Sequence, residues 1–202
     1  MSSAGQHSSS PGQHGSSPGQ YRVGPDRGRL ILRTARQGFA AQAGHDLVIE
    51  LTRWSGEVVL AADPAASTVS VTAEIGSIAV REGTGGIKPL SDRDRREIAQ
   101  TARKVLQVER HPQATFTSTS VSPDGAGGVL AGTLTLLGVE RPLRLEVTDL
   151  GGGRYRATGQ VMQSEYGIKP YTAFLGALKL ADPVGVEAEL DLSELDLSET
   201  GQ

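Results

Sequence analysis

Three polar residues in the first quarter of the chain have side chains that could do acid–base chemistry. His45 is followed directly by Asp46, and Glu50 lies four residues further on. A histidine base oriented by a carboxylate is a common catalytic pair. The sequence supplies no nucleophile beside it, because it has no Cys and no Ser in a G-x-S-x-G context. Two interpretations follow for His45: a base that acts on a small molecule, or a residue that caps a turn at the mouth of a barrel.

Metal ligation by histidine is the second chemistry to consider. His45 and His111 are the histidines outside the N-terminal repeat, and two histidines with a carboxylate can hold a metal ion. The sequence lacks the H-x-H and H-E-x-x-H spacings that would place two such ligands together. We therefore expect no metal site and no cofactor, and we interpret His111-Pro112 as a corner between a helix and a strand.

A glycine-rich segment, Gly83-Thr84-Gly85-Gly86-Ile87-Lys88, resembles a phosphate-binding loop in composition. It lacks the G-x-x-x-x-G-K-[ST] spacing, and Lys88 is followed by Pro89, which has no N–H to donate to a phosphate. The segment is better interpreted as a flexible flap or a bend at the rim of a barrel.

Composition excludes several classes of protein. The 202 residues carry a net charge of -3 and only 4% aromatic residues, which does not favour a partner that is a nucleic acid or an anionic membrane. The absence of Cys excludes disulfides and thiolate chemistry. There is no secretion signal at Met1 and no apolar run long enough to span a bilayer, so we expect a cytoplasmic protein that is not transmembrane.

Period-two alternation dominates the chain and predicts an all-β fold. The segment 133–147 is a hairpin, with Leu134 and Leu136 on one face before Gly138 and Leu143 and Leu145 on one face after Pro142. About eight such strands predict an extended antiparallel β-barrel or a sandwich. One amphipathic helix is inserted, from 92 to about 108, with Ser91 as its N-cap. The domain division expected is a Ser/Gly/Pro/His-rich tail at 1–20, a barrel at 21–192 and an acidic tail at 193–202.

The size of the inward side chains indicates a cavity. Many are small, and a barrel of about eight strands either fills with side chains or holds one small ligand. The small inward residues are Ala73, Ala114, Ser118, Ala157, Gly159 and Ala188. The larger ones, expected to line the cavity, are Val71, Phe116, Leu134, Leu136, Leu145, Val161 and Val186. Aromatic residues suited to a mouth or to a polar head group are Phe39, Trp54, Tyr166, Tyr171 and Phe174.

Four motifs together resemble the YceI-like family. They are the H-P-x-A-x-F segment at 111–119, the G-x-L-T hairpin at 132–142, the G-H-D turn at 43–46 and the S-E-Y-G stretch at 164–168. The resemblance implies a lipocalin-like barrel with a non-enzymatic role, namely binding a polyisoprenoid, an isoprenoid quinone or a similar amphiphilic lipid. It also implies that the barrel can pair as a homodimer. Leu137 and the loop 81–90 depart from the family pattern, and we expect Leu137 at a strand end outside the cavity.

Three functional hypotheses are therefore carried forward. The first is a barrel that stores or transports an apolar ligand, with His45 and nearby Tyr residues bonded to the polar end of the ligand. The second is an enzyme that uses His45 as a base. The third is a filled barrel that acts as a stress or interaction protein.

Overall fold

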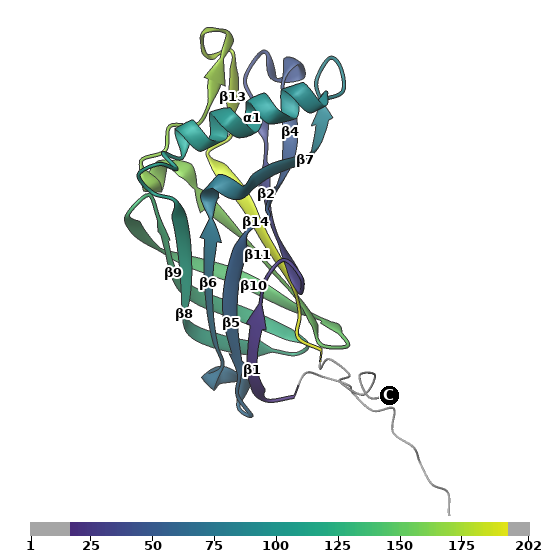
Figure 1. Cartoon of the computed structure of the whole chain (residues 1–202), viewed down its shortest axis with the longest axis vertical. Coiled ribbons are helices and arrows are strands. Elements are labelled where there is room, and N and C mark those ends of the chain that lie inside the picture. The colour runs from purple at the N-terminus through teal and green to yellow at the C-terminus, as the bar shows by residue number, and fades with distance from the viewer. Residues whose placement is uncertain (1–16, 194–202) are drawn as a thin grey trace, which may run out of the picture.

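The computed structural model describes residues 17–193 (Figure 1). Most of the two expected tails, at 1–20 and 193–202, lies outside these residues, so the expected domain division stays a prediction. The first strand begins at Gly19, two residues before the expected start of the barrel.

The fold is all-β with one helix, as the alternation predicted. Its main sheet has eleven strands in the order β1-β5-β6-β8-β9-β10-β11-β14-β2-β4-β7, and a small second sheet has the order β12-β13-β3. The strands are β1 (Gly19–Val23), β2 (Gly28–Thr34), β3 (Arg36–Gln37), β4 (His45–Leu51), β5 (Trp54–Leu60), β6 (Thr68–Glu74), β7 (Ile78–Gly85), β8 (Gln113–Asp124), β9 (Gly127–Leu136), β10 (Val139–Gly151), β11 (Arg154–Met162), β12 (Thr172–Ala173), β13 (Leu178–Leu180) and β14 (Pro183–Asp191). The 3₁₀ turns are η1 (Ala41–Ala43), η2 (Pro64–Ala66), η3 (Ile75–Ser77), η4 (Gln163–Tyr166) and η5 (Phe174–Gly176).

Eleven strands reduce to eight long segments, because three pairs of strands are interrupted only by short bends. β1 runs on into β2, β4 into β5, and β6 through η3 into β7. β1 pairs with β5 and β2 pairs with β4, so the first two bent segments lie side by side along their whole length. Counted this way, the pairing of β14 with β2 brings the curled sheet back to its first segment, which agrees with the expected lipocalin-like barrel of about eight strands.

The bends at 52–53 and 75–77 are fastened to each other by Ser77. Its hydroxyl accepts a hydrogen bond from the Arg53 N–H at 3.0 Å and donates to the Glu74 carbonyl at 2.7 Å. Its carbonyl accepts from the Thr52 N–H at 3.2 Å. Ser77 is only 4% exposed, and it is the one buried residue classed as polar within 17–193. A buried hydroxyl is retained at low cost when it is fully bonded, so Ser77 holds the two bends in register.

Beyond the bends, β7 leaves the β6–β8 side of the barrel and becomes an edge of the sheet. Helix α1 (Asp92–Val105) lies across this opening (Figure 1). The guanidinium of Arg103 donates to the carbonyls of Gly76 at 2.9 Å and Ile78 at 3.3 Å, which ties the helix to the bend. An edge strand covered in this way is protected from pairing with other chains.

The helix begins where the sequence indicated. The Ser91 hydroxyl accepts from the Asp94 N–H at 3.2 Å, and the Asp94 carboxylate accepts from the Ser91 N–H at 2.9 Å, which makes a capping box. These hydrogen bonds from Ser91 hold the pKa of Asp94 below its usual range. The α-helix ends at Val105, three residues before the expected end, because Gln107 has a positive φ of 47° and the chain continues as turns to His111.

Removing the Ser77 hydroxyl should destabilise the protein. We expect Ser77→Ala to lower the free energy of unfolding by about 1–3 kcal/mol, because the Arg53 N–H loses its buried acceptor. The matched control is Ser70→Ala in β6, where the side chain is exposed and the expected change is within about 0.5 kcal/mol. Chemical denaturation of both variants measures the difference, and equal midpoints would show that the bends do not depend on this hydroxyl.

Candidate functional site

The barrel encloses a cavity of about 510 Å³ between α1 and the inner face of the sheet. This volume lies within the roughly 300–1,000 Å³ typical of small-molecule sites. Its wall is mainly aliphatic. The wall residues include Leu30, Leu32, Leu47, Ile49, Leu51, Ile75, Ile78, Ile98, Val105, Leu106, Leu143, Ile168, Leu178, Leu180 and Val184.

All seven larger residues expected to point inward lie in this wall: Val71, Phe116, Leu134, Leu136, Leu145, Val161 and Val186. They come from β6, β8, β9, β10, β11 and β14, which together form one continuous side of the barrel. Ala73, Ala114, Ala157 and Ala188 also line the cavity, so small side chains do leave space there. Their contact with a ligand stays a prediction.

Leu137, expected at a strand end outside the cavity, lies in the turn between β9 and β10 with a φ of 53°. It packs against a hydrophobic cluster that includes Phe116 and Tyr166. It is absent from the residues that form the cavity wall.

The aromatic residues expected at the mouth do not all lie at the cavity. Tyr171 lines the cavity and is 44% exposed. Phe39 projects into solvent from the loop after β3. The side chain of Phe174 lies outside the described part of the structure.

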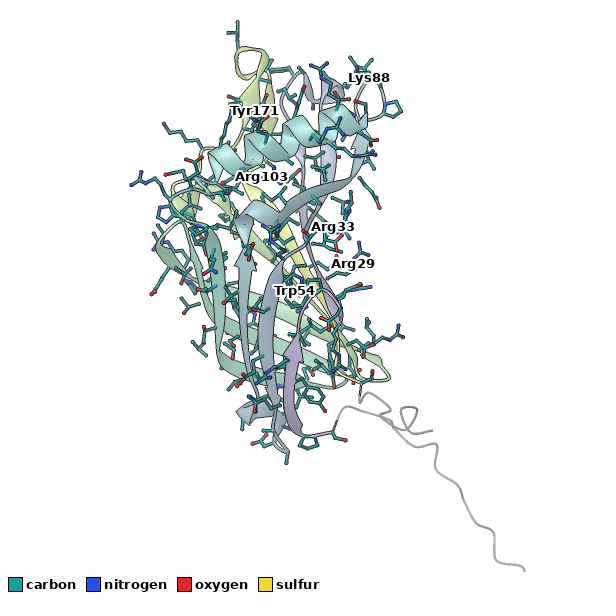
Figure 2. All side chains as sticks on the ribbon, in the orientation of Figure 1. Arg29, Arg33, Trp54, Lys88, Arg103 and Tyr171 are labelled. Carbon is teal, nitrogen blue, oxygen red and sulfur yellow. The ribbon has the colours of Figure 1, made fainter. Side chains whose placement is uncertain are left out.

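The expectation that Trp54 and Tyr166 lie at the mouth is wrong. Trp54 follows the first bend, and it is buried in a separate cluster with Val23, Val58 and Leu192 (Figure 2). Tyr166 ends η4 and is buried in the hydrophobic cluster that contains Phe116, and it does not itself line the cavity. Burial raises the pKa of Tyr166, and the charge of Glu165 raises it further against the opposing effect of Arg141.

The expected wall omitted the inward residues of β2 and β4 and the inner face of α1. Ile98, Ala102, Val105 and Leu106 close the cavity from the helix side, together with Thr101. Their spacing of three and four residues forms one stripe on the helix, a signal that was present in the sequence. The apolar stripe of α1 faces the sheet, as in most amphipathic helices. A cavity separates part of the stripe from the inner face of the sheet.

Polar groups gather at one end of the cavity. Arg36, His45 and Tyr171 all belong to its wall. The Arg36 guanidinium donates to the Gly44 carbonyl at 2.6 Å and lies 3.7 Å from the Asp46 carboxylate. This end offers a charged head group the hydrogen-bond donors of Arg36, His45 and Tyr171, and Figure 2 shows Tyr171 near the tip of the molecule.

The glycine-rich loop packs directly on this polar end. His45 Nε2 lies 2.9 Å from the Lys88 carbonyl oxygen. A Cβ at Gly86 would lie 2.2 Å from that imidazole, and one at Gly85 would lie 1.9 Å from the Arg36 guanidinium. Both glycines have positive φ, so the loop needs glycine for its backbone as well as for the close approach. The glycine-rich loop, expected to form a bend at the rim of the barrel, is therefore in contact with Arg36 and His45 of the cavity wall.

The hypothesis of a catalytic His45 lacks its expected carboxylate partner, because Asp46 accepts from the Arg36 N–H at 2.7 Å and lies 3.7 Å from the Arg36 guanidinium. A carbonyl oxygen only accepts, so Nε2 must carry the proton and donate to Lys88. Glu50 does not orient His45, because it lies with Arg81 at 2.6 Å and Arg29 at 3.6 Å. Burial alone would raise the pKa of Glu50, but these two guanidinium groups outweigh it and lower the pKa.

Within 17–193, no group of three or more His, Cys, Asp and Glu side chains is arranged to hold a metal ion. In that range no helix combines the length and the apolar character that crossing a bilayer requires. His111 lies at the turn before β8, close to Gly138 of the hairpin.

The fold and cavity agree with the match to a known family. The family model described as the YceI-like domain matches residues 23–192, which is most of the chain. The chain belongs to the YceI-like family. The resemblance seen in the four motifs is confirmed.

Curated relatives match over shorter stretches. A UPF0312 protein of Pectobacterium carotovorum is 35% identical over 91 residues, which cover 45% of this chain and 42% of the relative. Protein YceI of Escherichia coli is 40% identical over 73 residues, covering 32% of this chain and 38% of the relative. The matched segments thus span less than half the length of these YceI relatives.

Solved structures share the fold over much more of the chain. BcnA of Burkholderia cenocepacia superposes with a TM-score of 0.63 at 17% identity, covering 83% of this chain and 98% of BcnA. A polyisoprenoid binding domain from Saccharophagus degradans superposes with a TM-score of 0.52 at 15% identity, covering 86% and 97%. At these identities the comparison establishes the YceI-like barrel itself.

The contact between the loop and His45 can be tested with one methyl group. Gly86→Ala should lower the free energy of unfolding by about 1 kcal/mol, because position 86 has a left-handed φ. It should lower it by about 1 kcal/mol more, because the new methyl displaces the His45 imidazole from the Lys88 carbonyl. Gly152→Ala is the control, because Gly152 also has a positive φ of 64° but nothing within 4 Å of the new methyl. Chemical denaturation compares the two, with the imidazole proton resonances as a second readout. Equal losses and unchanged resonances would contradict the packing.

Proposed function

We propose that this barrel binds a polyisoprenoid or a similar amphiphilic lipid without catalysing a reaction. The apolar tail would occupy the cavity, and the polar end would lie beside Arg36, His45 and Tyr171. The observation that carries the proposal is the mainly aliphatic cavity of about 510 Å³.

The cavity has the physical character that such a ligand requires. Each Å² of apolar surface removed from water contributes about 25 cal/mol, before the costs of association are subtracted. An isoprenoid chain has no polar atoms to satisfy, and the wall provides almost none except at one end. Empty apolar cavities of this kind stay dry and take up apolar molecules. A head group with a hydrogen-bonding oxygen would match the donors at the polar end.

The open interior favours this function over the alternative of a filled barrel. The polyisoprenoid binding domain from Saccharophagus degradans has the same fold, which supports an isoprenoid as the ligand class. Storage and transport of the lipid both follow from reversible binding in such a cavity. The proposed role is passive in either case, because Asp46 and Glu50, the carboxylates expected to orient His45, interact with arginines instead.

Filling the cavity should abolish lipid uptake. We expect Ala157→Phe to weaken binding of an isoprenoid quinone about tenfold or more, because the new ring occupies the space of the ligand. Ala102→Leu on α1 tests the same space from the opposite wall. The measurement is native mass spectrometry of lipid-free protein after incubation with the quinone, with circular dichroism as a check on folding.

The control is the neighbouring position on the same strand. Thr158 is exposed on the outer face of β11, so Thr158→Phe adds the same ring outside the barrel and should leave uptake unchanged. Wild-type protein that takes up no quinone and retains no extractable lipid would refute the proposal. Equal uptake by the Ala157 and Thr158 variants would place the ligand elsewhere.

A further inference from the structure

Three loops at the polar end of the cavity each present one large apolar side chain to solvent. Phe39 follows β3 and is 106% exposed, Ile87 follows β7 and is 86% exposed, and Leu175 lies between β12 and β13 and is 109% exposed. Single exposed apolar residues are ordinary on protein surfaces. Here three of the five large exposed ones within 17–193 come from loops that meet at one end of the barrel.

Contacts between the loops show that they form one surface. The Ala40 N–H donates to the Ala177 carbonyl at 3.0 Å, which joins the first loop to the third. β3 pairs with β13 directly beneath them. The second loop joins the first through the contact of Gly86 with the His45 ring. Figure 1 shows all three loops protruding together above β13, β4 and β7.

The same loops carry positive charge. The ranges 36–45, 83–91 and 167–180 contain Arg36, Lys88, Lys169 and Lys179, and no Asp or Glu. Asp46 lies 3.7 Å from Arg36 at the base of the first loop, and Lys88 acts on the Asp94 carboxylate at the start of α1, where its charge helps to lower the pKa of Asp94. The exposed Lys169 and Lys179 therefore provide most of the uncompensated charge. The whole chain has four lysines and a net charge of -3, so three of its lysines are concentrated at this end.

The other end of the barrel has no such group of lysines. The turns there, at 61–67, 122–128 and 149–153, carry Asp63, Asp124 and Asp149, with Arg154 directly after the third turn. The lysines are therefore concentrated at the end of the molecule where the polar groups of the cavity wall lie. Such an asymmetry orients a protein as it approaches a charged surface.

We propose that this loop end docks on an anionic lipid bilayer, with Phe39, Ile87 and Leu175 inserted at the boundary between head groups and acyl chains. Apolar side chains backed by lysines are the combination that holds proteins at a membrane interface. Docking would bring the mouth of the cavity to the surface where an amphiphilic lipid resides. The docking itself needs no ligand in the cavity, so it can be tested separately from lipid binding.

A bilayer fits this surface better than a second copy of the chain. A twofold dimer through this end would place the same three lysines of both copies against each other. The three apolar side chains also project from separate loops, which suits insertion into a fluid medium more than packing against a flat partner.

Vesicle co-sedimentation of lipid-free protein tests the proposal. Wild type should bind vesicles of equal parts phosphatidylcholine and phosphatidylglycerol, bind phosphatidylcholine alone far more weakly, and detach as salt is raised. The triple variant Phe39→Ser, Ile87→Ser and Leu175→Ser should lose most of the binding. Its control is Leu150→Ser, which removes an exposed apolar side chain from the opposite end, where the residue is 38% exposed.

A second set of variants tests the contribution of the lysines to vesicle binding. Lys88→Gln, Lys169→Gln and Lys179→Gln should each weaken binding to the anionic vesicles about fivefold. Lys104→Gln, near the C-terminal end of α1, should have little effect. Binding to neither vesicle, or an equal loss in the Leu150 control, would overturn the proposal. Concentration-dependent dimerisation that the triple variant abolishes, without vesicle binding, would assign the surface to a second copy instead.

Discussion

The hydrogen bonds that join the bends at 52–53 and 75–77 through Ser77 determine how the rest of the barrel is arranged. A continuous sheet of eight long segments would keep β7 beside β8 and close tightly over its own interior. The two bends instead direct β4 and β7 away together, so the barrel opens on one side above Ser77. The Ser77 hydroxyl stabilises this geometry because it is itself buried and bonds to the backbone of both bends.

The opening explains why the barrel contains a cavity and why a helix is inserted at that point in the chain. α1 covers the unpaired edge of β7, and Arg103 fixes it to carbonyls beside the bend rather than to side chains. A helix is wider than a strand and stands further from the sheet, so its apolar stripe meets the opposite wall across a space. The alanines at 73, 114, 157 and 188 keep that space open.

Much of this could be predicted from sequence, because period two is a strong local signal. The inward positions on β6, β8, β9, β10, β11 and β14 follow from alternation alone, and all seven larger ones reach the cavity. Trp54 was misplaced because alternation carries no information across a bend, and neither bend contains a proline or a glycine pair to mark it. The helix face was recognised as apolar, but amphipathicity alone does not say whether the partner surface is in contact or stands across a cavity.

The concentration of lysines at one end of the barrel could not be predicted, for a different reason. Net charge sums over the whole chain, and -3 suggested no preference for an anionic surface. Antiparallel topology places the turns at 61–67, 122–128 and 149–153 at one end and the longer links at the other, while the two-residue turn at 137–138 is an exception. Three of the four lysines occur in the longer links, so folding brings together at one end residues that are far apart in the sequence. The long links are also free to vary in shape, whereas the turns must satisfy strand geometry. The end of the barrel that can evolve a docking surface is therefore the same end at which the cavity meets its polar groups.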